Sequence, residues 1–356
     1  MSDISALPQP PASASRGLVY PFESPGDGRS MEVAPGVLWI CMPMPGSLKH
    51  INLWALRDGD GWTLVDTGLQ NPDTTAAWQR LLSEDLKPGA PRRIIATHMH
   101  PDHVGMAGWL ARRYDVKLWM TRLEYLTCRV LVADTGRPAP IAGERFYRST
   151  GWGDESIEQY RSRFGGFGKA VHALPDDYRR LRDGEVLRIG EHDWQVIVGT
   201  GHSPEHACLY CPALSLLISG DQVLPKISSN VSVHPTEPDA DPLGDWLASI
   251  EKIRAQVPDD VLVLPAHNEP FRGLHARLSR LAAGHQRGLE RLRERLSEPR
   301  RVIDVFGALF ARPINGHQLL SLATGEALAH LNYLLARGEI TCTPDAQGVD
   351  WYQRAA

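Results

Sequence analysis

Short apolar runs alternate with helical patterns along residues 37–264. Runs rich in Val, Ile, Leu and Trp that are bounded by Gly, Pro or Asp predict β-strands. These runs cover residues 37–41, 51–56, 62–65, 92–96, 116–120, 186–189, 194–198, 207–211, 214–218 and 261–264. Asp58-Gly59-Asp60-Gly61 predicts a hairpin turn, because Asp-Gly supplies positive φ angles. Helical spacing is present at 74–82 and 104–114. Strands that alternate with helices indicate an α/β layered domain.

Two segments depart from this alternation. In 121–180, aromatic residues are interleaved with arginines and glycines, which predicts a mostly helical insertion. After Pro270 the chain becomes helical, with predicted helices at 274–296, 301–310, 316–323 and 324–336 and a closing hairpin at 340–342 and 349–352. Helices closed by a hairpin suggest a winged-helix layout. We therefore expect a disordered tail at 1–20, a catalytic domain at 21–270 that includes the insertion, and a small C-terminal winged-helix-like domain at 271–356.

The composition is that of an ordinary soluble globular protein. Of the 356 residues, 42% are hydrophobic and 22% are charged. The net charge of −4 argues against a chain built as a whole to coat nucleic acid. No run approaches the ~20 apolar residues of a membrane span, and residues 1–16 lack the apolar segment of a secretory signal. We therefore expect no membrane partner.

The five cysteines are scattered and odd in number, so a disulfide framework is not expected. This pattern favours the reducing cytoplasm. Cys208 and Cys211 have CxxC spacing but lie in a predicted strand, where residues three apart point to opposite faces. We interpret them as ordinary strand cysteines.

The segment Thr97-His98-Met99-His100-Pro101-Asp102-His103 directly follows the apolar run 94–96. A strand that ends in such a cluster presents several metal ligands from one loop. Imidazole suits Zn²⁺, and a neighbouring carboxylate neutralises charge and can serve a second metal. A merely polar loop is a poor alternative, because gathering such groups without partners is costly.

Three later strand ends each add one more ligand. His202 follows the run 196–198, Asp221 follows 216–218, and His267 follows 261–264. Together with the first cluster they give five imidazoles and two carboxylates. This set is enough for two metal ions with a position left open for water.

These motifs, in this order, resemble the complete motif series of the metallo-β-lactamase-fold hydrolases over roughly residues 35–270. The series reads Asp66-Thr67-Gly68, His98-x-His100-x-Asp102-His103, His202, Asp221 and His267. The resemblance implies an αββα sandwich with the site along one edge. One departure is Glu205, in Gly-His-Ser-Pro-Glu-His, where many relatives have Gly, so the shape of this substrate loop stays open.

The same resemblance implies how the ligands divide between two metals. A first metal would be bound by His98, His100 and His202. A second metal would be bound by Asp102, His103 and His267, and Asp221 would bridge the two. Asp66 would orient ligands or nearby backbone without binding a metal itself. Zinc is the expected metal, and iron or manganese stays open, because a His/Asp site does not select zinc alone.

The ligand set indicates hydrolysis. Two metals that share a water lower its pKa towards neutrality and yield a hydroxide nucleophile. Asp102 and Asp221 are the candidate catalytic carboxylates, and Asp102 or the metal-bound water system is the candidate proton acceptor. We predict a small-molecule substrate, namely a small acyl compound, with thioesters first and lactones or other esters next. A phosphodiesterase or ribonuclease and a hydrolytic dehalogenase of an activated aromatic are the alternatives.

Two other classes are disfavoured. Oxygen-reducing di-iron relatives usually replace the second His of the HxH pair by a carboxylate ligand and have a flavin-binding domain, so His100 argues against them. A metal-binding regulator is disfavoured because the ligand set leaves a position for reactive water.

The remaining histidines receive other predictions. For His206 we favour a hydrogen-bonded structural role, and His234 is a candidate substrate contact. The others are expected at the surface or in packing: His172, His192, His275, His285, His317 and His330.

The two appended segments offer further hypotheses. The insertion at 121–180 could shape a pocket for a large anionic thioester such as an acyl-CoA or glutathione thioester, and a packed aromatic core with solvated arginines is an equal alternative. The C-terminal segment resembles the extension of the thioesterase and endoribonuclease branch. Its arginines could suit RNA phosphates: Arg277, Arg280, Arg287, Arg291, Arg293 and Arg295. The interspersed Glu290, Glu294 and Glu298 favour a solvated or homodimer-packing helix over nucleic-acid binding.

Overall fold

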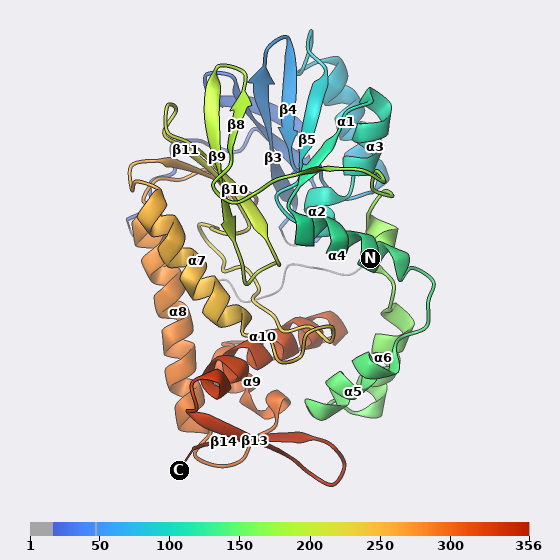
Figure 1. Ribbon diagram of the computed structural model, residues 1–356, viewed down its shortest axis with the longest axis vertical. Coiled ribbons are helices and arrows are strands. Elements are labelled where there is room, and N and C mark those ends of the chain that lie inside the picture. Colours follow the sequence, from blue (N-terminus) through green and yellow to red (C-terminus); the bar gives the residue numbers. More distant parts are fainter. Residues whose placement is uncertain (1–16, 47, 356) are drawn as a thin grey trace.

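Two β-sheets lie face to face between layers of helices in the computed structural model, which describes residues 17–46 and 48–355 (Figure 1). The first sheet contains, in spatial order, β1 (Arg29–Ala34), β2 (Val37–Pro43), β3 (His50–Asp58), β4 (Gly61–Val65), β5 (Pro91–Ile95), β6 (Leu118–Met120) and β7 (Arg179–Arg180). The second sheet has the order β12 (Leu262–Pro265), β11 (Leu216–Gly220), β10 (His206–Cys211), β9 (His192–Gly199) and β8 (Val186–Ile189). The predicted hairpin at 58–61 joins β3 to β4.

Three buried clusters define the layers. Between the sheets lie Trp39 and Trp54 of the first sheet and Trp194 of the second. The outer face of the first sheet packs against α1 (Pro72–Ser83) and α3 (Ala107–Tyr114). The outer face of the second packs against α7 (Pro242–Gln256) and α8 (Leu274–Arg295). Apolar burial on both faces of both sheets therefore gives the predicted αββα sandwich.

The sequence pattern missed or misjudged several elements. Strand β1 and helix α7 were not predicted, although α7 buries Leu243, Trp246, Ile250 and Ile253 at helical spacing. The predicted helix 104–114 is two helices, α2 (Pro101–Val104) and α3. The interruption lets Met106 N donate to Gly68 O at 3.1 Å. Met106 N therefore makes a tertiary hydrogen bond in place of one within a continuous helix.

The insertion is mostly helical, as predicted, with α4 (Arg122–Ala133), α5 (Ile141–Ser149), α6 (Asp154–Arg163) and a 3₁₀ turn, η2 (Phe167–Ala170). Tyr147 stacks on Trp152 with ring centroids 4.2 Å apart, and Ile303 from the C-terminal region packs against them. Arg161 pairs with Glu144. The packed aromatic core considered for this segment is therefore present.

The C-terminal region contains α8, η3 (Val302–Val305), α9 (Phe306–Leu309), α10 (His317–Ala336) and a hairpin of β13 (Ile340–Pro344) and β14 (Asp350–Arg354). The predicted helices 316–323 and 324–336 are one helix, within which Thr324 Oγ1 donates to Leu320 O. The predicted helix 301–310 is only η3 and α9. One hydrophobic cluster includes Trp246 of α7, Leu289 of α8 and Leu331 of α10, so the core is continuous across residue 270.

Most of the predicted tail, residues 1–16, lies outside the described residues. Residues 17–20 are packed: Leu18 is buried, and Val19 exchanges two backbone hydrogen bonds with Arg272. The predicted boundary at residue 20 therefore falls within packed chain. Within the described residues, no helix is both long and apolar enough to cross a membrane.

The basic helix α8 is less solvated than predicted. Arg277 is buried, with 3% of its surface exposed, and its guanidinium donates to two backbone carbonyls. Arg293 pairs with Glu339, and Arg291 donates to Ala308 O. These three arginines therefore bond within the chain, and the prediction of a solvated face is wrong for Arg277.

The cysteines behave as predicted. Cys208 belongs to the cluster outside the second sheet, whereas Cys211 belongs to the cluster between the sheets. The two therefore point to opposite faces of β10. All five cysteines are free.

Candidate metal centre

Five strand ends bring the predicted site residues together at one edge of the sandwich. Asp66 follows β4, the loop 98–103 follows β5, His202 follows β9, Asp221 follows β11 and His267 follows β12. Because β4 is parallel to β5, and β11 is parallel to β12, these ends meet at the same edge. Side chains far apart in sequence thereby come within contact distance.

The ligand atoms form two groups. His98, His100, His202 and Asp221 each offer one ligand atom within 4.8 Å of the others. Asp102, His103 and His267 do the same in a second group. Asp221 lies between them: its Oδ2 is 3.4 Å from His202 Nε2, and its Oδ1 is 3.6 Å from His267 Nε2.

Three buried polar atoms at this centre are of the kind that binds a cation. His103 Nε2, His202 Nε2 and Asp221 Oδ1 are buried and have no hydrogen-bond partner among the described residues. Such an atom costs about 1–3 kcal/mol when it stays unsatisfied. All three are metal-ligating atoms that point into the same space, so coordination would satisfy them together. Imidazole and carboxylate donors suit zinc, and also iron or manganese.

The electrostatics of the centre follow from burial and close charges. Burial, together with neighbouring imidazoles, lowers the pKa of His98 well below its usual value and that of His100 to about 3. Burial would raise the pKa of Asp102, but His103 and His267 outweigh it and lower the pKa to about 2. At His103, burial would lower the pKa, but the neighbouring carboxylates outweigh burial and raise the pKa well above the usual range. The centre therefore combines ionised carboxylates with two imidazoles, those of His98 and His100, that keep a lone pair, whereas His103 releases a proton when it binds a metal.

Asp66 orients one of these imidazoles. It is 1% exposed, has a left-handed φ of 60°, and accepts a hydrogen bond from His103 Nδ1 at 2.8 Å. It also accepts from Thr97 N at 2.7 Å and from Thr97 Oγ1 at 2.9 Å. Because Asp66 accepts the proton at Nδ1 of His103, the proton that metal binding displaces is the one on Nε2.

His206 positions Asp221 from behind. Its Nε2 accepts from Asp221 N at 3.1 Å, and its side chain is fully buried. A Cβ on Gly220 would lie 2.5 Å from the same nitrogen, so this approach requires glycine. The predicted hydrogen-bonded structural role of His206 is confirmed. His285 and His330 are likewise packing residues, with a nitrogen-to-nitrogen distance of 3.2 Å.

The side chain of Glu124 is the main feature of the centre that sequence reasoning missed. It is fully buried on α4 and accepts from Met99 N at 2.9 Å, Ser203 Oγ at 2.6 Å and Glu205 N at 2.7 Å. It therefore ties the loop of His98 and His100 to the loop of His202. Burial raises the pKa of Glu124. Its one sequence signal is a Glu in the first turn of a helix that follows a strand.

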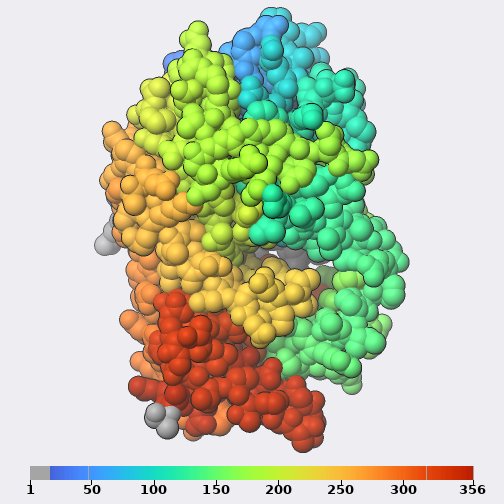
Figure 2. Space-filling view, in the orientation of Figure 1, coloured from blue at the N-terminus to red at the C-terminus, as the bar shows by residue number. Residues whose placement is uncertain are grey.

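Glu205 binds the beginning of the same helix. Its Oε2 accepts from Leu123 N at 2.9 Å, and its backbone oxygen accepts from Thr121 Oγ1 at 2.7 Å. The residue that departs from the family pattern thus joins the His202 loop to α4. Figure 2 shows a hollow between the insertion, drawn in green, and the segment around residues 224–241, drawn in yellow.

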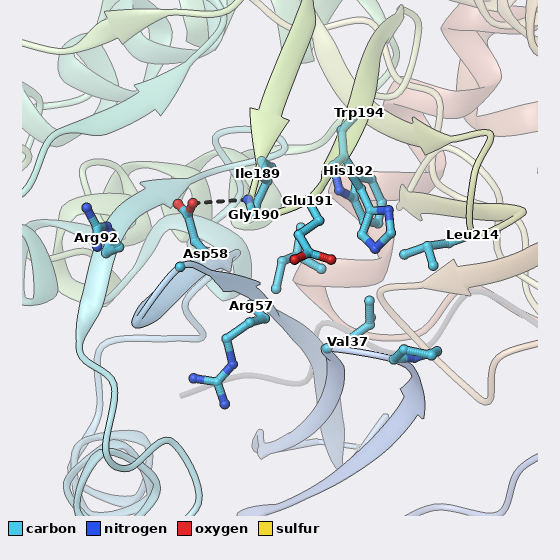
Figure 3. A pocket seen from close by; sticks show the side chains of 14 residues that line it. Val37, Arg57, Asp58, Arg92, Ile189, Gly190, Glu191, His192, Trp194 and Leu214 are labelled. Atoms are coloured by element: carbon cyan, nitrogen blue, oxygen red, sulfur yellow. Dashed lines mark hydrogen bonds between the residues drawn. The ribbon is translucent and has the colours of Figure 1, made fainter.

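A second hollow, of about 650 Å³, lies at the other edge of the sandwich (Figure 3). It is lined by turns that precede β2, β4 and β9, opposite to the strand ends that carry the ligands. Asp58, on its floor, accepts from Gly190 N at 3.1 Å and from Thr63 Oγ1 at 2.8 Å, and it pairs with Arg93. This carboxylate links the two sheets, and its hydrogen bonds and ion pair give it a structural role.

The fold and the site together define a metallo-hydrolase built on an αββα sandwich. The model of the metallo-beta-lactamase superfamily matches residues 47–267, and that of the metallo-beta-lactamase-like C-terminal domain matches 289–355. The chain therefore belongs to the metallo-beta-lactamase superfamily.

Known proteins resemble most of the chain. It is 25% identical over 315 residues to the probable metallo-hydrolase YqjP of Bacillus subtilis, covering 86% of this chain and 94% of that protein. It is 27% identical over 275 residues to the human acyl-coenzyme A thioesterase MBLAC2, covering 75% and 86%. A beta-lactamase domain protein from Burkholderia ambifaria has a crystal structure with a TM-score of 0.88 and 38% identity, covering 96% and 100%.

Proposed function

We propose that this metallo-hydrolase cleaves a small acyl substrate, with thioesters first, by means of two zinc ions bound at the candidate centre. The observation that supports it is the pair of ligand groups on either side of Asp221, with buried ligand atoms that lack partners among the described residues. When bound, two such ions polarise a carbonyl oxygen and bring the pKa of a water near neutrality.

The residues of the chain have distinct roles in this proposal. His98, His100 and His202 would hold the first ion, Asp102, His103 and His267 would hold the second, and Asp221 lies between the two groups. Asp66, through His103, keeps one ligand in the correct tautomer. Asp102, which lies 3.3 Å from His267 Nε2, or the metal-bound water system would take up the proton that the attacking water loses.

Two observations favour an acyl substrate over RNA. A relative that matches 75% of the chain is named an acyl-coenzyme A thioesterase. In addition, Arg277 is buried and Arg293 is paired, so the basic helix offers phosphates fewer free guanidinium groups than its sequence suggested. His234, which is exposed on the segment after β11, is the proposed substrate contact.

The compartment and assembly also remain proposals. The free state of all five cysteines is compatible with a reducing cytoplasm. Localisation of a tagged full-length chain, and its mass in solution, would test the cytoplasmic compartment and the homodimer respectively.

The test is a hydrolysis screen with metal-reconstituted protein. The substrates are an acyl-CoA, a glutathione thioester, a lactone, bis-p-nitrophenyl phosphate, an activated aryl halide and RNA. We expect about two zinc ions per chain and turnover of a thioester, with both lost in His98→Ala and Asp221→Ala. Parallel reconstitution with iron and manganese identifies the preferred metal. Turnover of RNA alone would contradict the acyl proposal, and full activity in both variants would contradict the metal centre.

A further inference from the structure

A short chain of hydrogen bonds runs from His202, a proposed metal ligand, through Asn230 to Glu326 on α10. Asn230 lies in the segment that follows Asp221. His202 Nδ1 donates to the backbone oxygen of Asn230 at 2.7 Å. The side chain of Asn230 donates from Nδ2 to Glu326 Oε2, on α10, at 2.9 Å. Ser232 Oγ donates to the other end of the same amide, Asn230 Oδ1. Asn230 is thereby fixed on both sides of its side chain while its carbonyl orients His202.

Glu326 is an unusual residue to find at this position. Only 9% of its surface is exposed, and burial raises its pKa to about 7. A buried carboxyl is costly unless it is hydrogen-bonded, and the amide of Asn230 supplies that bond. Its own backbone is fixed as well, because His330 Nδ1 donates to Glu326 O at 2.8 Å. The carboxyl is therefore held on a rigid helix and aimed at Asn230.

The backbone brings α10 close to the same segment. Val233 N donates to Gly325 O at 3.0 Å. A Cβ on Gly325 would lie 2.7 Å from Ser232 Oγ, so a side chain there would push the helix away. Helix α8 secures the earlier part of the segment, because Arg277 donates to Leu224 O and to Ile227 O. Two C-terminal helices thus hold the segment between Asp221 and Val233.

We infer that Glu326 is a positioning residue for the first metal and acts through Asn230 on His202. The inference rests on the proposed metal centre and adds a role for the C-terminal helix α10. Asn230 O accepts the Nδ1 proton of His202, which leaves the Nε2 lone pair for the metal and sets the plane of the ring. Glu326 sets the position of that carbonyl. Loss of the Glu326 contact lets the carbonyl move, and the imidazole loses its fixed direction.

The test compares two Glu326 variants with a control from the same helix. Glu326→Leu removes the acceptor, whereas Glu326→Gln keeps an oxygen that can accept from Asn230. Asn332→Leu is the matched control: Asn332 is also 9% exposed and bonds the same segment, at Pro238 O and Ala240 O, but beyond the part that contacts His202. Each full-length variant is titrated with Zn²⁺ against a chelator, without substrate, and its thermal unfolding is recorded.

We expect Glu326→Leu to weaken zinc binding at the first site by about 10- to 100-fold, the usual effect of losing a partner behind a ligand. Glu326→Gln should bind zinc within a few-fold of the parent, and Asn332→Leu should bind it normally even if it unfolds at a lower temperature. In Asn230→Ala, the further change Glu326→Leu should have little additional effect, because both act on one carbonyl.

Other results would overturn the inference. If Glu326→Leu is folded and binds two zinc ions with the parent's affinity, Glu326 does not position the ligand. If Asn332→Leu weakens zinc binding equally, the effect is only a general loss of stability in the C-terminal region. A parent chain that binds no metal would instead refute the proposed function, and this inference with it.

Discussion

Nδ1 of His103 donates a hydrogen bond to Asp66 at 2.8 Å, and both side chains are buried. A neutral imidazole has one donor nitrogen and one acceptor nitrogen, so this bond determines which one faces the metal centre. Asp66 thus orients His103, a proposed metal ligand, without being a proposed ligand itself.

Asp66→Asn should weaken zinc binding at the second site by about 10- to 100-fold. Asn tolerates the left-handed φ of 60°, so the backbone is preserved, but its amide group replaces one of the two accepting oxygens. Chelator competition measures the affinity. Asp60→Asn, in an exposed turn, is the control and should behave as the parent does. Equal affinities in all three proteins would contradict the role given to Asp66.

Glu205→Gly restores the residue that many relatives have. It removes the acceptor of Leu123 N at the beginning of α4, which should lower the free energy of unfolding by about 1 kcal/mol. KM for the best substrate should change, because α4 belongs to the insertion that borders the hollow, while zinc content stays at the parent's value. Urea unfolding, steady-state kinetics and elemental analysis check the three outcomes. Loss of zinc would show that Glu205 supports the metal ligands directly.

Arg277→Met should lower the free energy of unfolding by about 2–4 kcal/mol. The change leaves the buried Leu224 O and the half-buried Ile227 O without their donor. Burial lowers the pKa of Arg277 only to about 10, so the guanidinium is charged at neutral pH. Arg287→Met, at an exposed position of the same helix, should change stability by less than about 0.5 kcal/mol. Equal effects of both changes would mean that the buried contacts contribute nothing specific.

The buried pair His285 and His330 should make stability depend on pH. Burial, with the other imidazole nearby, lowers the pKa of His285 to about 3, and burial lowers that of His330 to about 4, both from 6.5. Below pH 6.5 the unfolded chain binds protons that the folded chain does not. The free energy of unfolding should therefore fall as pH drops from 6.5 towards 4, by up to about 1.4 kcal/mol per pH unit for each histidine.

Urea unfolding of the zinc-loaded protein at several pH values measures that slope. His285→Gln with His330→Gln should flatten it by the share of these two groups, even if the double variant is less stable at pH 7. An unchanged slope would show that other buried histidines, and not this pair, cause the acid sensitivity.

Local patterns in the sequence predicted an α/β layered domain and the convergence of ligands, whereas the αββα sandwich was implied by the family resemblance. A strand is visible as an apolar run, and a ligand directly after a run must lie at a sheet edge. The parallel pairs β4–β5 and β11–β12 then place Asp66, Asp102, Asp221 and His267 together. The division of the ligands between two metals came from the family resemblance, and it stays a prediction.

What the sequence could not predict depends on tertiary contact. Glu124 and Glu326 are ordinary helical glutamates in the sequence, and only the folded chain buries them against Ser203 and Asn230. Arg277 belongs to a run of arginines that reads as a solvated face, but the segment after Asp221 covers it. Helix periodicity says which residues share a face, and not what packs against that face.

The hydrogen bond from Trp152 Nε1 to Thr324 Oγ1, at 2.9 Å, joins the insertion to helix α10. The insertion and the C-terminal region, which lie far apart in the sequence, are thus in direct contact. A loop graft that swaps residues 121–180 for those of a relative would break this contact and disturb the helix that bonds Asn230. An engineered exchange of the insertion should therefore include α10, so that the two segments are replaced together.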